Sequence, residues 1–174
     1  MNVKPLILYP LLGSLLLAIG TTGCSEQGSG PHTVRPIELK AMLRIVAKED
    51  FSGLVVAMAS WCPSCRKELP LLAELYRRHQ EEGVEIVAVS VEADGPKAVQ
   101  SLVNTLEIPF PVYWVGPAAA EHYRLIGIPT LIIYDHGRLR EKIPGSQPLE
   151  ALEAKIKTLL PGAGPSGGRS MDQP

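Results

Sequence analysis

Apolar residues recur with two different spacings between residues 37 and 160. An unbroken apolar run over residues 54–59 predicts a strand that is covered on both faces, and the run 84–91 predicts the next strand. Apolar residues spaced three or four apart predict helices over residues 37–48, 63–82, 96–106, 117–126 and 149–160. Two β-rich runs, 130–134 and 139–143, surround a hairpin signal at residues 135–138. The alternation predicts an α/β fold with a central mixed β-sheet flanked by helices, ending in a C-terminal hairpin and helix.

The first 24 residues follow a different pattern. Lys4 precedes an apolar stretch from Leu6 to Gly20, and small residues lead to Cys24, which predicts a secretory signal peptide over residues 1–23. The stretch is short for a membrane span, and Pro10 interrupts it, although an uncleaved anchor and a buried core helix are alternatives. Small residues directly before a cysteine resemble the bacterial lipobox, with Thr21 where leucine is usual. This resemblance implies that Cys24 is acylated and tethers the chain to a membrane.

Two segments lack the apolar residues that a core needs. Residues 24–36 are small, polar or Pro/Gly-rich and are predicted to form a flexible tether. Residues 161–174 have a similar composition and are predicted to be a disordered tail. The chain has 174 residues, including 16 Gly and 16 Pro, and is 45% hydrophobic. One folded domain over residues 37–160 is therefore expected.

The charge balance excludes one class of partner. The chain has 17 Lys+Arg and 18 Asp+Glu, a net charge of −1, and it has no basic cluster. Nucleic-acid phosphates would require a basic patch, so no nucleic-acid partner is expected. Three cysteines are too few for a disulfide scaffold, which leaves one lone cysteine and one close pair to explain.

The close pair, Cys62 and Cys65, follows a predicted strand and begins a predicted helix. Unpaired N–H groups and the helix dipole at this position stabilise a thiolate, so Cys62 is predicted to be the nucleophile. Pro63 suits the first helical turn, and Cys65 would be the resolving thiol. Half of a zinc site is one alternative, but no second C-x-x-C or H-x-x-x-H occurs. An inert structural disulfide is the other, although so small a loop restricts the unfolded chain little.

Residues 37–160 resemble the thioredoxin superfamily and, within it, the membrane-tethered thiol-disulfide oxidoreductases of the TlpA/ResA type. The resemblance rests on the strand–WCPSC–helix junction, Pro70 in the following helix, Gly127-Ile128-Pro129-Thr130 before a strand, and the run 84–91. It implies a thioredoxin-like fold with a cis-Pro129 opposite the cysteines. The backbone at Ile128 would then pair with an extended substrate peptide. Trp61 and Pro63 would flank the same substrate site, although Trp61 packed in the core is an equal alternative.

Glu68 lies three residues after Cys65, on the same helical face. It could simply be an acid that favours the helix dipole, but in the TlpA/ResA type a glutamate at this offset is a functional group. Ordinary thioredoxins place a buried aspartate six residues before the first cysteine, where this chain has Val56. Glu68 is therefore the expected proton acceptor, whereas Glu92 and Asp94 are expected to be solvated loop acids.

The predicted activity is thiol-disulfide exchange on proteins, without a cofactor or metal. The resemblance implies a disulfide reductase outside the cytoplasm, serving apocytochrome c thiols or similar clients. Its expected partners are protein thiols and disulfides, a membrane or extracytoplasmic electron donor, and the membrane that holds the N-terminal lipid. The protein is expected to act as a monomer.

Three other activities use related residues. A disulfide oxidase would use the same cysteines at a more oxidising potential. A thioredoxin-fold copper chaperone usually has three residues between its cysteines and a distant histidine, a role that His122 or His136 would have to fill. A peroxidase of the peroxiredoxin branch does not normally place its cysteine in a C-x-x-C. His79, His122 and His136 are expected to be structural.

Overall fold

The computed structural model describes residues 33–160, which form one six-stranded sheet and its covering helices. The strand order is β1-β4-β3-β2-β5-β6. Strands β1 to β4 run parallel to one another, β5 is antiparallel to β2, and β6 is antiparallel to β5, so the predicted mixed sheet is confirmed. The strands are β1 (Arg35–Pro36), β2 (Gly53–Met58), β3 (Glu85–Ser90), β4 (Val112–Trp114), β5 (Thr130–Asp135) and β6 (Arg138–Pro144).

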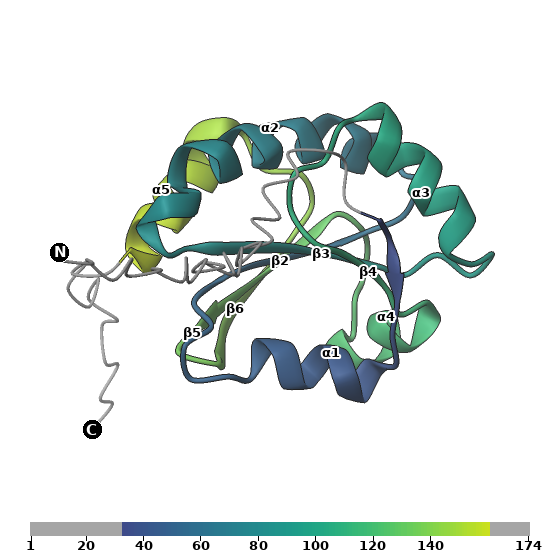
Figure 1. The fold of residues 1–174 in the computed structure, drawn as a ribbon, viewed down its shortest axis with the longest axis horizontal. Helices are drawn as coiled ribbons and strands as arrows, with labels where there is room; N and C mark the ends of the chain where they lie inside the picture. Colours follow the sequence, from purple (N-terminus) through teal and green to yellow (C-terminus); the bar gives the residue numbers. More distant parts are fainter. Residues whose placement is uncertain (1–32, 161–174) are drawn as a thin grey trace, which may run out of the picture.

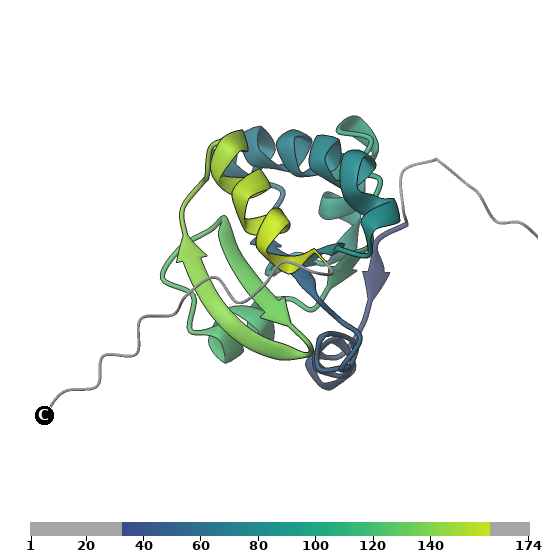
Figure 2. The same cartoon turned by 90° about the vertical axis from the view of Figure 1, so that its left-hand side faces the viewer.

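Helices cover both faces of the sheet (Figure 1). One face carries α2 (Pro63–His79), α3 (Pro96–Thr105) and α5 (Leu149–Leu159), and the other carries α1 (Leu39–Val46) and α4 (Pro117–Tyr123). Figure 2 shows α5 beside α2 on the same face. Alternate residues of β2 explain the two layers: Leu54 and Val56 pack in the cluster beneath α2, while Val55 packs with α1. The unbroken apolar run thus reflects burial on both sides.

The position of α2 decides where the cysteines lie. Its first residue is Pro63, which follows β2 after a short loop, as the apolar pattern predicted. Pro70 lies inside the helix. A 3-10 turn, η1 (Gln80–Glu82), follows α2, and Gly83 then adopts a left-handed conformation with φ of 86°. The backbone therefore leaves the helical conformation at Gly83, directly after the predicted helical range 63–82.

The predicted boundary between tether and domain needs correction. Arg35 and Pro36, assigned to the tether, form β1 and pair with β4. Val34 is buried, and its N–H donates to Gln100 Oε1 at 2.7 Å. These contacts are long-range, so a polar and Pro-containing segment joins the sheet without any local apolar pattern.

Several predictions concern residues outside the described range. These are the signal peptide over residues 1–23, lipidation of Cys24, most of the tether and the tail over residues 161–174. Among the helices of residues 33–160, none is long and apolar enough to cross a membrane.

Candidate active site

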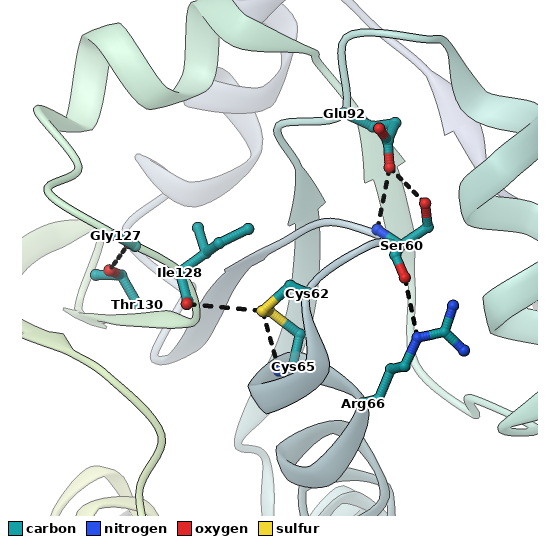
Figure 3. The surroundings of a disulfide bond; sticks show 8 residues. All are labelled: Ser60, Cys62, Cys65, Arg66, Glu92, Gly127, Ile128 and Thr130. Atoms are coloured by element: carbon teal, nitrogen blue, oxygen red, sulfur yellow. Dashed lines mark hydrogen bonds between the residues drawn. A yellow bond between two sulfur atoms is a disulfide. The ribbon is translucent and has the colours of Figure 1, made fainter.

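Cys62 and Cys65 form a disulfide at the start of α2 (Figure 3). Cys62 is the N-cap residue of the helix, and the Cα atoms of the two cysteines lie 5.3 Å apart. The Cys65 N–H donates to Cys62 Sγ at 3.1 Å. Both residues are buried, with Cys62 slightly the more exposed. A thiolate on Cys62 would therefore receive a backbone hydrogen bond and the positive end of the helix dipole.

The loop before β5 faces the disulfide from the opposite side. The Ile128–Pro129 peptide bond is cis, as the family resemblance implied, and Ile128 O lies 3.6 Å from Cys62 Sγ. Two hydrogen bonds hold this loop: the Thr130 hydroxyl donates to Gly127 O at 2.7 Å, and the Gly145 N–H donates to Pro129 O at 2.8 Å. After reduction, the Cys62 thiol can donate to the Ile128 carbonyl (Figure 3).

Exposed apolar side chains adjoin both halves of the site. Trp61 is 63% exposed, which favours the flanking role over the packed alternative. Pro63 is exposed as well, whereas Pro129 is buried. Ile126, two residues before Ile128, is 89% exposed, although it was not among the predicted site residues. Ile126 fell within the predicted helix over residues 117–126, but α4 ends at Tyr123, so Ile126 lies in the loop that follows the helix.

Glu68 is buried one helical turn after Cys65. The backbone N–H of Gln147 donates to Glu68 Oε1 at 2.7 Å, while Oε2 is buried with no hydrogen-bond partner among the described residues. Burial raises the pKa of the Glu68 carboxyl, and the hydrogen bond from Gln147 partly opposes this effect. The arrangement suits a carboxyl group that holds a proton and exchanges it.

The raised pKa of Glu68 predicts a pH-dependent stability. Because the folded chain binds this proton more tightly than the unfolded chain, protonation favours the folded state. The contribution is complete below the usual pKa of 4.5 and is lost as the pH rises through the raised pKa of the folded protein. In urea titrations above about pH 4.5, we expect the free energy of unfolding to fall more with pH in the wild type than in Glu68→Gln.

Glu81→Gln is the matched control, since Glu81 is an exposed glutamate just after the same helix. It should show the pH dependence of the wild type. Equal pH dependence in Glu68→Gln and the wild type would contradict the role of burial at Glu68.

The expectation that Glu92 is a solvated loop acid is wrong. Glu92 is only 2% exposed, and its Oε2 accepts hydrogen bonds from Ser60 N–H at 3.1 Å and from Ser60 Oγ–H at 2.5 Å. Strands β2 and β3 are parallel, and Met58 pairs with Ser90, so the segments that follow them emerge side by side. Asp94 is exposed, as expected.

The histidines make contacts elsewhere in the fold. The His122 ring packs edge-on against Tyr123, and His136 lies in the β5–β6 turn, where its N–H donates to Ser52 Oγ. His79 Nδ1 lies 2.9 Å from Glu82 Oε1. Over residues 33–160, no three His, Cys, Asp or Glu side chains gather as potential metal ligands.

A thioredoxin-like sheet that brings a C-x-x-C disulfide against a cis-proline loop defines the class: this is a thiol-disulfide oxidoreductase. Residues 34–142 match the AhpC/TSA family, and the chain belongs to it. The predicted thioredoxin-like fold class and redox activity are thus confirmed.

Two relatives carry the name thiol-disulfide oxidoreductase ResA. The one from Bacillus thuringiensis subsp. konkukian is 34% identical over 118 residues, covering 65% of this chain and 68% of its own. The one from Oceanobacillus iheyensis is 32% identical over 122 residues, covering 67% of this chain and 62% of its own. The resemblance to the TlpA/ResA type is confirmed by these similarities.

Solved structures share the fold at lower identity. A thiol:disulfide interchange protein from Chlorobium tepidum matches with a TM-score of 0.59 at 23% identity, covering 70% of this chain and 85% of that one. StoA from Bacillus subtilis matches with a TM-score of 0.54 at 24% identity, covering 61% of this chain and 82% of that one. At these identities the likeness concerns the fold.

Proposed function

We propose that the protein reduces disulfides of client proteins outside the cytoplasm, with Cys62 as the nucleophile and Cys65 as the resolving thiol. The observation that carries this proposal is the position of Cys62 at the N-terminus of α2, facing Ile128 O at 3.6 Å and adjoining the exposed Trp61. The position at the start of α2 and the hydrogen bond from the Cys65 N–H both favour a thiolate on Cys62 rather than on the fully buried Cys65.

The reaction proceeds in two exchanges. The Cys62 thiolate attacks one sulfur of the client disulfide, forming a mixed disulfide and releasing the other client sulfur as a thiolate. Cys65 then attacks Cys62 Sγ, which re-forms the enzyme disulfide and releases the second client thiolate. Glu68 takes the proton that Cys65 loses. Two electrons pass to the client, and a dithiol donor in the membrane or outside the cytoplasm returns them to the cysteine pair.

The client would bind as an extended segment between the two loops of the site. Its backbone would pair with the backbone at Ile128, next to Pro129, as an added strand does at a sheet edge. Trp61 and Pro63 would contact apolar groups beside the client cysteine, since both are exposed next to Cys62. Apocytochrome c thiols or similar clients are the proposed substrates.

We further propose that the domain is held at a membrane through a lipid on Cys24. The apolar segment, the small residues before this cysteine and the polar residues after it support this arrangement. Residues 1–23 would be removed as a signal peptide, and the domain would act as a monomer that needs no cofactor.

The reduction potential of the Cys62/Cys65 couple tests the direction of transfer. We expect a value near that of thioredoxin, about −270 mV, in equilibrium with glutathione. Replacing Cys24 with serine leaves Cys62 and Cys65 as the remaining thiols. A value near −120 mV would make the protein an oxidase, and the absence of any redox couple would refute both activities.

A further inference from the structure

The buried side chain of Glu92 contacts the segment that leads to Cys62. Both the N–H and the hydroxyl of Ser60 donate to the same oxygen, Glu92 Oε2, at 3.1 and 2.5 Å (Figure 3). Glu92 is itself held at its backbone, because its N–H donates to Ser90 Oγ at 3.1 Å and its carbonyl accepts from Trp114 Nε1 at 2.8 Å. The backbone of Glu92 is therefore held by residues of strands β3 and β4.

Both hydrogen bonds from Ser60 end on the same oxygen of Glu92. Two donors converge on one oxygen of Glu92, which stabilises a carboxylate more than a neutral acid. In the part of the chain that the structure describes, no Lys, Arg or His forms an ion pair with Glu92. Within residues 33–160, hydrogen bonds rather than an ion pair hold the Glu92 side chain, and a low-dielectric surrounding carries the field of a negative charge further than water would.

The bonded segment leads directly to the nucleophile. Ser60 is two residues before Cys62, and the Cys62 N–H donates to Ala59 O at 3.3 Å, so the intervening turn is closed. Arg66 Nε donates to Ser60 O at 3.0 Å from the first turns of α2. Glu92 therefore holds the Ser60 N–H and Arg66 holds the Ser60 carbonyl, and Figure 3 shows the carboxylate above Ser60 and the guanidinium below it.

We propose that Glu92 is a positioning residue that holds the segment from Ser60 to Cys62 and, through its negative charge, makes the Cys62/Cys65 couple more reducing. This inference rests on the proposed function only in taking Cys62 as the nucleophile. The role of Glu92 is separate from that of Glu68, which lies in α2 on the Cys65 side.

The charge acts on the reduced form of the couple. A fixed negative charge near Cys62 opposes formation of its thiolate and so raises the pKa of the thiol. The disulfide carries no charge and is not affected in this way. Because the reduced form alone is destabilised, the equilibrium moves toward the disulfide and the potential becomes more negative. Arg66 opposes this effect from the other side of the loop, but it is exposed to solvent, which screens it.

The variant Glu92→Gln tests the charge while preserving an oxygen acceptor for Ser60. In the full chain with Cys24→Ser, we expect the pKa of Cys62, followed by thiolate absorbance, to fall by about 0.5 pH units. At a pH above that pKa, the equilibrium constant with glutathione should shift about threefold toward the dithiol, which is about 14 mV.

Asp94→Asn is the matched control, since it removes one negative charge from an exposed position two residues further on. It should leave the pKa of Cys62 and the equilibrium constant unchanged. Glu92→Asp keeps the charge and should remain closer to the wild type than Glu92→Gln does in both measurements. A purely structural role would instead lower the stability of both Glu92 variants, and the pKa of Cys62 in Glu92→Asp would then not lie closer to the wild type than in Glu92→Gln.

Equal effects of Glu92→Gln and Asp94→Asn, or no effect of either, would overturn the inference and leave the proposed function intact. If the wild type shows no redox couple, the proposed function itself fails. Should Glu92→Gln lack the native circular dichroism spectrum, Ser60→Ala provides the test. It removes one donor from the carboxylate and leaves the charge, so the pKa of Cys62 should rise, and an unchanged or lower pKa would overturn the inference.

Discussion

Replacing Cys65 with serine is expected to lower turnover by roughly 1000-fold or more and to trap the protein on its clients. Cys62 keeps its place at the start of α2 and still attacks the client disulfide. The mixed disulfide then lacks its intramolecular resolving thiol. A thiol held in place acts at an effective concentration far above that of millimolar free thiols, so release by external thiols is much slower.

Turnover is followed with oxidised insulin as the probe, and trapped complexes are seen by non-reducing electrophoresis. Cys62→Ser is the matched control, and it should show neither turnover nor a mixed disulfide. Wild-type turnover in Cys65→Ser, or trapping through Cys65 in Cys62→Ser, would show that the two cysteines have been assigned the wrong roles.

Gly53→Ala is expected to lower the free energy of unfolding by about 3 kcal/mol or more. Gly53 is the first residue of β2 and pairs with Glu85 of β3 in the middle of the sheet. A Cβ atom on Gly53 would lie 2.1 Å from Glu85 O and 2.8 Å from Glu85 C, which are backbone atoms. A flexible side chain could move aside, but here the two central strands would have to separate, so the overpacking cost is large.

Gly127→Ala is the control for this measurement, since a Cβ atom at Gly127 has no neighbour within 4 Å and its φ lies outside the left-handed region. Urea unfolding followed by circular dichroism should place Gly127→Ala within about 1 kcal/mol of the wild type. A similar loss in both variants would mean that the general cost of replacing glycine, rather than the contact with Glu85, explains the result.

Most elements of the fold were predictable because their signals are local. The run 54–59 has no polar residue until Ser60, which indicates a strand buried on both faces, and the structure forms β2 there. The helix over residues 63–82 was predicted from apolar spacing, and α2 together with η1 occupies that range. The spacing of Cys62 and Cys65 places both thiols in one helical turn, so their pairing also required no distant contact.

Other elements had no such signal. Strand β4 has three residues and β1 has two, too few for any periodicity, and β1 was assigned to the tether. They form strands because β3 offers an open edge to β4, which in turn pairs with β1. Likewise Glu92 follows a strand, as solvated loop acids often do, and it is buried only because the parallel strand β2 delivers Ser60 beside it.

The sequence by itself determined most of the elements and the redox pair, since each of these depends on residues close together in the chain. The tertiary structure decided what surrounds that pair: Ile128 O beside Cys62, the N–H of Gln147 on the Glu68 carboxylate, and Ser60 on Glu92. These contacts join residues 32 to 79 positions apart. They arise from sheet order and register, which are set by the packing of the whole domain rather than by any local pattern.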